Sequence, residues 1–216
     1  MGNREALLAG AKKCLLDKGY SRTTARDIAT ASGVSLAAIG YHFGSKEALL
    51  TAALLQAIEE WDTEFRHALG TANSQAATPM ERFESTWTRM IASFTKHRQL
   101  WVANFEIFAQ IDHIPEVRQA IDNGLLQKAR AGLVSLFEQI DEATVDERSM
   151  RTSGSIYYAL LTGVLVQWLI DPAHAPSGHD LAEGLRIITQ NVLPTSRSGE
   201  TRSIQRLKPP KRSASR

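Results

Sequence analysis

The chain has 216 residues, of which 43% are hydrophobic and 22% are charged, a composition typical of globular rather than disordered proteins. Its single cysteine, Cys14, excludes an intramolecular disulfide and a cysteine-ligated metal site, and suits a reducing compartment such as the cytoplasm. Its apolar runs are shorter than the ~20 residues of a spanning helix, so we expect no membrane span and no secretion signal. We also expect no metal and no cofactor.

Charge is distributed unevenly along the chain. Lys and Arg number seven against four Asp and Glu in residues 1–50, eleven against eighteen in residues 51–194, and seven against one in residues 195–216. The net charges of these segments are therefore +3, −7 and +6. The last segment is rich in Ser, Arg, Lys and Pro, so we expect a disordered basic tail. It would act either as a solubilising extension or as an arm that adds non-specific phosphate contacts.

Apolar residues recur with helical period, and the first of these helices are short. An apolar stripe over residues 4–18 ends at Gly19, a residue suited to a helix C-terminal cap. Thr24 and Asp27 have the spacing of a capping box, so a second helix is expected to begin there and to stop at Gly33.

A third helix is expected to be capped by Ser35 and to end at Phe43. A fourth helix is expected to end near residue 70, before a polar linker at 71–78. A fifth is expected to open at Thr78-Pro79, a sixth to cover about 99–111 and a seventh about 115–140. An eighth is expected to open with a capping box at 144–147, and a ninth to cover about 179–193. Because no strand pattern is evident, the predicted fold class is all-α, with about nine helices. Residues 1–46 would form a three-helix domain, residues 47–194 a larger helical bundle, and residues 195–216 the tail.

Residues 20–50 have the pattern of a helix-turn-helix. Two short helices that cross around a sharp turn need a small residue in the first helix, glycine at the turn and apolar residues that hold the second helix. Ala29, Gly33, Val34 and Ile39 meet these needs. The same spacing also fits a purely structural helical corner.

Over residues 5–55 the chain closely resembles the N-terminal domain of the TetR family of transcriptional regulators. The resemblance rests on Gly19-Tyr20, Thr23-Thr24, Asp27-Ile28-Ala29, Gly33-Val34-Ser35, and Tyr41-His42-Phe43 with Ser45-Lys46-Glu47-Ala48-Leu49 directly after. Beyond residue 55 it consists only of the number, length and order of helices. It implies that residues 1–46 bind DNA and that residues 47–194 bind a ligand and form a dimer.

The resemblance also implies that the third helix enters the major groove of double-stranded DNA. Thr24 would donate to a phosphate at a helix N-terminus, and small apolar side chains would meet thymine methyl groups. The implied DNA-binding residues are Thr24, Ser35, Leu36, Ala37, Ala38, Tyr41, His42 and Lys46. Periodicity alone would bury Leu36, so a core position stays open for it. Gly40 stands where many relatives carry a DNA-contacting tyrosine, so one contact is expected to be missing.

Aromatic and soft residues are frequent in the larger segment, where they either pack a core or line a cavity. The resemblance implies a cavity for a small apolar or aromatic effector, with Asn104 and Gln167 as polar groups that could orient it. The candidate effector-binding residues are Trp87, Met90, Phe94, Trp101, Asn104, Phe105, Phe108, Tyr157 and Gln167.

The last two predicted helices are candidates for a dimer interface. Residues 156–169 are apolar nearly all round, so this helix must be covered on every side, either centrally in a monomer or by a second copy. Leu181, Leu185, Ile188 and Val192 give the last helix a matching stripe. In the family these helices pack against their two-fold copies, which implies a homodimer and a palindromic operator.

These observations predict a cytoplasmic, homodimeric DNA-binding regulator, a repressor released from a palindromic operator by a small-molecule effector. An activator or a ligand-independent regulator is the alternative, and a helical enzyme or carrier is the remote one. We expect no enzyme activity, because Cys14 lies within an apolar stripe and the chain has neither a nucleophile elbow nor a phosphate-binding glycine loop.

Overall fold

The computed structural model describes residues 2–70 and 78–193, so most of the predicted linker and the predicted basic tail lie outside the described residues. Throughout this part of the chain the regular structure is helical, which confirms the all-α fold class. The helices are α1 (Asn3–Lys18), α2 (Ala25–Ser32), α3 (Leu36–Phe43), α4 (Lys46–Gly70), α5 (Pro79–Lys96), α6 (Arg98–Phe108), α7 (Pro115–Asp122), α8 (Leu125–Glu138), the 3-10 helix η2 (Glu142–Thr144), α9 (Glu147–Arg151), α10 (Ser153–Ile170) and α11 (Gly178–Val192).

The single helix predicted over residues 115–140 is wrong, because the structure divides it into α7 and α8. The break lies at Asn123-Gly124, where Gly124 has the left-handed values φ 93° and ψ 15°. Only glycine adopts this conformation at little cost, so the chain turns here instead of continuing the helix.

The capping box predicted at residues 144–147 is also wrong. Thr144 belongs to η2, and its hydroxyl donates to the Asp141 carbonyl at 2.7 Å. Asp146 caps α9 instead, because its carboxylate accepts from the Ser149 N–H at 2.7 Å. A second interruption at Thr152, with φ −101° and ψ −95°, separates α9 from α10.

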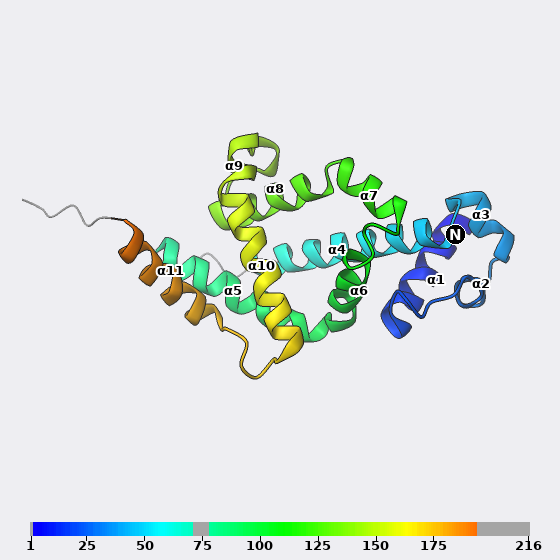
Figure 1. The fold of residues 1–216 in the computed structure, drawn as a ribbon, viewed down its shortest axis with the longest axis horizontal. Coiled ribbons are helices and arrows are strands. Elements are labelled where there is room, and N and C mark those ends of the chain that lie inside the picture. Colours follow the sequence, from blue (N-terminus) through cyan, green and yellow to red (C-terminus); the bar gives the residue numbers. More distant parts are fainter. Residues whose placement is uncertain (1, 71–77, 194–216) are drawn as a thin grey trace, which may run out of the picture.

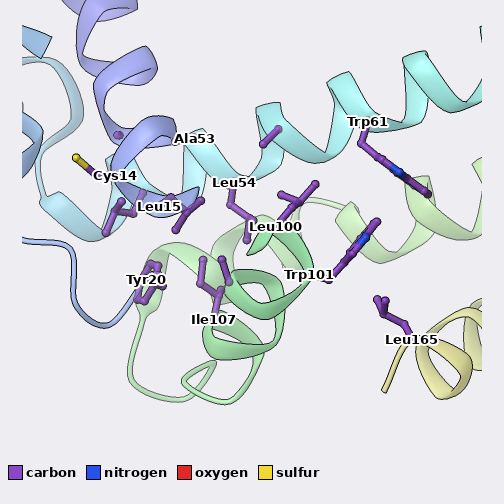
Figure 2. Packing of buried hydrophobic residues seen from close by; sticks show 14 of the residues in the cluster. Cys14, Leu15, Tyr20, Ala53, Leu54, Trp61, Leu100, Trp101, Ile107 and Leu165 are labelled. Carbon is purple, nitrogen blue, oxygen red and sulfur yellow. The ribbon is translucent and has the colours of Figure 1, made fainter. Parts of the chain in front are cut away.

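Helices α1–α3 form a head at one end of the molecule, and α4 runs from this head through the remaining helices, the body (Figure 1). Within the body α10 packs on α8, and α11 packs on α5. One buried apolar cluster extends from the head into the body. Figure 2 shows Leu15 and Tyr20 of the head beside Leu54 of α4 and Ile107 of α6. The head is therefore joined to the body by apolar packing as well as by the chain.

Contrary to the expectation from the lengths of the apolar runs, residues 147–170 are long and apolar enough to cross a membrane when judged by length and composition alone. In this structure the segment belongs to the helical bundle, and Val164, Leu165 and Trp168 of α10 are buried in the core. Most residues of this apolar segment are not buried within one copy of the chain. This helix thus has both a packed side and an open side.

Candidate nucleic-acid interface and effector site

The turn between α2 and α3 has the geometry of a helix-turn-helix. Gly33 ends α2 with φ 68° and ψ 17°, a left-handed conformation in which glycine avoids the Cβ clash. Ile28 of α2 and Ile39 of α3 are buried in the core and hold the two helices against α1 and α4. This packing leaves the opposite side of α3 open.

The N-terminus of α2 is fixed by the predicted capping box. The Thr24 hydroxyl accepts from the Asp27 N–H at 3.1 Å and donates to the Asp27 carboxylate at 2.7 Å. Lys18 Nζ lies 2.6 Å from the same carboxylate, which ties α2 to the end of α1. These hydrogen bonds, chiefly the one from Lys18 and then those from Thr24, hold the pKa of Asp27 well below its usual value. The Asp27 carboxylate is therefore ionised at neutral pH, beside Thr24 at the N-terminus of α2.

Helix α3 presents several of the predicted DNA-binding side chains to solvent. Leu36 is 49% exposed and Tyr41 is 87% exposed, while Ser35 and Ala37 are also exposed. Ala38 and His42 are half-buried. Leu36 is therefore not a core residue in this structure, so the core position that periodicity alone favours for it is wrong. The large exposure of a tyrosine leaves its ring free to meet a partner.

Ser35 occupies the N-cap position of α3, but its side chain makes no capping hydrogen bond, so that expectation is wrong. Its backbone carbonyl accepts from the Ala38 N–H at 3.0 Å. The Ser35 hydroxyl is thereby left exposed and outside the helix's own hydrogen bonding.

Lys46 begins α4 beside both loops of the head. Its Nζ donates to the Thr23 carbonyl at 3.2 Å, lies 3.3 Å from the Glu47 carboxylate and stands 5.9 Å from the centre of the Tyr20 ring. Burial raises the pKa of Tyr20 to about 12, and the negative charges of Glu47 and Glu116 add to the shift. Lys46 thus adds positive charge near the end of α3 while its side chain is held by the protein.

Arg4, Arg22 and Arg26 are further basic residues of the head that lie outside the motifs that carry the family resemblance. Arg4 places its guanidinium 5.1 Å from the centre of the Phe43 ring, at the end of α3. Arg22 Nε donates to the Lys18 carbonyl at 2.7 Å, and Arg26 is exposed on α2. The predicted site did not include these residues, and the positive charge of the first 50 residues was the only sequence signal for them.

The predicted effector residues fall into two aromatic clusters of the body. In the first, Trp87 and Tyr157 both stack on Phe137, with ring centres 5.5 and 4.6 Å from it. In the second, Trp101 contacts Phe94 at 6.0 Å and Trp61 at 4.7 Å. Met90 is buried between these parts of α5. The structure thus divides these five predicted residues between two groups, of which Trp87, Met90, Phe94 and Trp101 are buried and Tyr157 is half-buried.

The remaining predicted effector residues are less deeply placed. Asn104, Phe105 and Phe108 are half-buried on α6, and Gln167 is exposed with its amide donating to the Gly163 carbonyl at 3.2 Å. The indole N–H groups of Trp87 and Trp101 are buried without a hydrogen-bond partner. Two donors in the aromatic interior are therefore available to an acceptor.

Two surface hollows lie on the described part of the body, and neither is lined by a predicted effector residue. One of about 490 Å³ runs along the outer face of α4 beside Glu59, Glu60 and Glu64. The other, of about 270 Å³, lies between α4 and α5 beside Trp61 and Arg89. Within each aromatic cluster the ring centres lie 4.6–6.0 Å apart, so an effector that enters between these rings would have to displace side chains.

Comparison with known proteins connects this geometry to regulators of transcription. Residues 7–53 match the family model described as bacterial regulatory proteins, tetR family. The HTH-type transcriptional repressor BepR of Brucella suis biovar 1 (strain 1330) is 25% identical over 193 residues, which cover 86% of this chain and 88% of that protein. The HTH-type transcriptional repressor AcnR of Corynebacterium efficiens is 40% identical over 52 residues, covering 24% of this chain and 28% of that protein.

The whole fold is also similar to a solved structure. Thermus thermophilus FadR, a TetR family transcriptional repressor in complex with lauroyl-CoA, matches with a TM-score of 0.57 and 20% identity, covering 91% of this chain and 98% of that one. At this identity the likeness concerns the fold, and it extends through the body as well as the head.

Proposed function

This chain belongs to the TetR family of bacterial regulatory proteins, and on that premise we propose that it is a cytoplasmic, homodimeric repressor that leaves a palindromic operator when a small molecule binds. The observation that carries the DNA-binding part is the open face of α3. Tyr41 is 87% exposed and Leu36 is 49% exposed, although both belong to a helix whose other side is packed on the core. In this role the protein is a regulator rather than an enzyme.

Contacts from the head would combine phosphate binding with base reading. We assign Thr24, Ser35, Tyr41, His42 and Lys46 to the phosphate backbone, which positions the protein without reading sequence. Leu36, Ala37 and Ala38 would meet base edges in the major groove, where apolar side chains favour thymine methyl groups. Because these three side chains form no hydrogen bonds, operator preference would also depend on DNA shape and on half-site spacing.

A matched pair of variants tests this assignment. Lys46→Ala removes a cation at the proposed interface, and Lys128→Ala removes an exposed cation on α8 in the body. We expect Lys46→Ala to weaken operator binding and to reduce the slope of log affinity against log salt by about one for each head. Equal slopes for the wild type and Lys46→Ala would refute the assignment, and a change with Lys128→Ala would show that the effect is not local.

The proposed dimer interface lies on α10 and α11. Nine large apolar side chains are exposed in the described part of the chain, and six of them lie on these helices or directly after α11: Ile156, Ile170, Ile187, Ile188, Val192 and Leu193. A high share of the exposed apolar side chains on two helices is typical of a protein interface. A two-fold copy would cover them and would place two recognition helices on one operator.

The proposed effector site lies between the two aromatic clusters. Burying a polar group without a partner is unfavourable, so the free N–H groups of Trp87 and Trp101 support a ligand that brings hydrogen-bond acceptors. A ligand can release DNA only if it binds the released state more tightly than the DNA-bound state. The four tryptophans of the chain provide a fluorescence signal for screening compounds, and a compound that changes this signal should also weaken operator binding.

A further inference from the structure

Two carboxylates of the body hold the two loops of the head. Glu106 lies on α6, and its Oε2 accepts from the backbone N–H groups of Tyr20 at 2.7 Å and Ser21 at 3.2 Å. Glu116 lies in the first turn of α7, and its Oε1 accepts from the Ser45 hydroxyl at 2.6 Å. Tyr20 and Ser21 belong to the loop between α1 and α2, and Ser45 belongs to the turn between α3 and α4. One stretch of the body, α6 to α7, therefore contacts both sides of the helix-turn-helix.

These loops lead directly to proposed DNA-binding residues. Thr24 follows the first loop as the N-cap of α2, and Lys46 follows Ser45 in the chain. The hydrogen bond from Lys46 Nζ to the Thr23 carbonyl joins the two loops to each other. A movement of either carboxylate would thus be passed to groups that we place on the phosphate backbone.

One side of helix α6 faces the head, and its opposite side faces the aromatic interior. Gln110, in the turn directly after α6, also contacts the head, because its amide donates to the Ser21 hydroxyl at 3.3 Å. At 3.6 residues per turn, the proposed effector residues Trp101, Asn104, Phe105 and Phe108 fall on the other half of the helix. Trp101 packs there against Trp61. If a ligand in the aromatic interior displaced α6, Glu106 would therefore move with the helix.

These hydrogen bonds set orientation more than they hold the head folded. Apolar packing holds the head folded, because Leu7, Leu15 and Ile28 are fully buried in the cluster that it shares with the body. Hydrogen bonds to a carboxylate are stronger than those between neutral groups, and they fix direction as well as distance. Glu106 accepts its hydrogen bonds from backbone N–H groups, so these bonds directly constrain the backbone of the loop between α1 and α2.

We propose that Glu106 and Glu116 are positioning residues that fix the angle of the head on the body and thereby the spacing of the two recognition helices in the dimer. This role rests on the proposed function, because spacing matters only to a protein that reads two half-sites. Helix α6 links the effector side of the body to this angle, in addition to α4, which joins the two parts covalently.

The test compares Glu106→Ala with Glu106→Gln and Asp112→Ala. The amide oxygen of glutamine can still accept the two hydrogen bonds, so Glu106→Gln should rescue the function. Asp112→Ala removes a negative charge from the same region, but the Asp112 carboxylate pairs with Arg118 on α7 and forms no hydrogen bond to the head within the described residues. It therefore controls for the general effect of one negative charge fewer near DNA.

The probe is a duplex that the wild-type chain recovers from random sequences, remade with its half-sites moved apart or together by one and two base pairs. We expect the wild type, Glu106→Gln and Asp112→Ala to bind the original spacing best. Glu106→Ala should bind it at least about tenfold more weakly, since the loss of a single charge-assisted hydrogen bond corresponds to about that factor, and should discriminate less between spacings. Hydrogen exchange at the Tyr20 and Ser21 amides, measured without DNA, should be faster in Glu106→Ala alone.

A Glu106→Ala protein that keeps the wild-type affinity and spacing preference overturns the positioning role and leaves the proposed function intact. A loss of affinity with unchanged spacing preference also overturns it, because general destabilisation would produce that result. A folded, dimeric wild type that enriches no duplex overturns the proposed function together with this role.

Discussion

Replacing Ile188 by aspartate should dissociate the proposed dimer without unfolding the chain. Ile188 is 60% exposed on α11, so a second copy would bury most of its side chain. Full burial of an isoleucine stabilises by about 1.5–3 kcal/mol, which gives about 1–2 kcal/mol for the exposed part. The two-fold axis doubles this to about 2–4 kcal/mol, equivalent to a roughly 30- to 700-fold rise in the dimer dissociation constant. The cost of burying a charge would add to that rise.

The assay is sedimentation velocity over a concentration series, with Ile140→Asp as the matched control. Ile140 is also an exposed isoleucine, at 40%, but it lies in the loop after α8 rather than on α10 or α11. Both variants should remain folded, because surface substitutions usually change the free energy of unfolding of a single chain by less than about 0.5 kcal/mol. An unchanged dimer dissociation constant in Ile188→Asp, or an equal change in Ile140→Asp, would refute the reasoning.

Three other predictions concern the stability of the fold. Trp61→Phe should lower the free energy of unfolding by about 1 kcal/mol more than Trp87→Phe in urea titrations, because only the first removes a made hydrogen bond, and equal losses would contradict this. Gly178→Ala should cost about 1–3 kcal/mol in the same assay, since its Cβ would lie within 2.6 Å of the α5 backbone, while Gly184→Ala, with open space around it, should not. The hydrogen bond from the lysine at the end of α1 lowers the pKa of Asp27, so the wild type should lose stability as pH falls below about 4. In Asp27→Asn, the difference in melting temperature between pH 7 and pH 3 should be smaller than in the wild type. An equal difference in the two proteins would contradict this prediction.

Local patterns predicted the head well because its structure is determined by nearby residues. The capping box of Thr24 and Asp27 and the turn at Gly33 each depend on residues fewer than four positions apart, and the structure has both. Local patterns failed where two neighbouring signals competed. Thr144 and Asp146 both resemble N-caps, and the aspartate is the one that caps a helix. Asn123-Gly124 is a turn dipeptide inside an otherwise helical pattern, so this break was visible in the sequence but was outweighed by the period around it.

The contacts between head and body could not be predicted from the sequence. Glu106 is 86 positions away from Tyr20, and Glu116 is 71 positions away from Ser45. A glutamate on a helix is usually solvated, and nothing local distinguishes these two from Glu59 or Glu60 of α4. Leu36 shows the reverse case, since its period predicted burial while the packing of α3 leaves it about half exposed. Both depend on how whole helices are placed in space.

The most direct test of the account is selection of bound DNA from random fragments by the purified full-length chain at near-physiological salt. We expect a two-fold symmetric consensus, because two copies of α3 related by the dimer axis would read identical half-sites. Tyr41→Ala should bind the recovered duplex about tenfold more weakly than the wild type, since it removes a proposed contact from an exposed position. A folded, dimeric protein that enriches no sequence, or one whose binding does not depend on Tyr41, His42 and Lys46, would contradict the account.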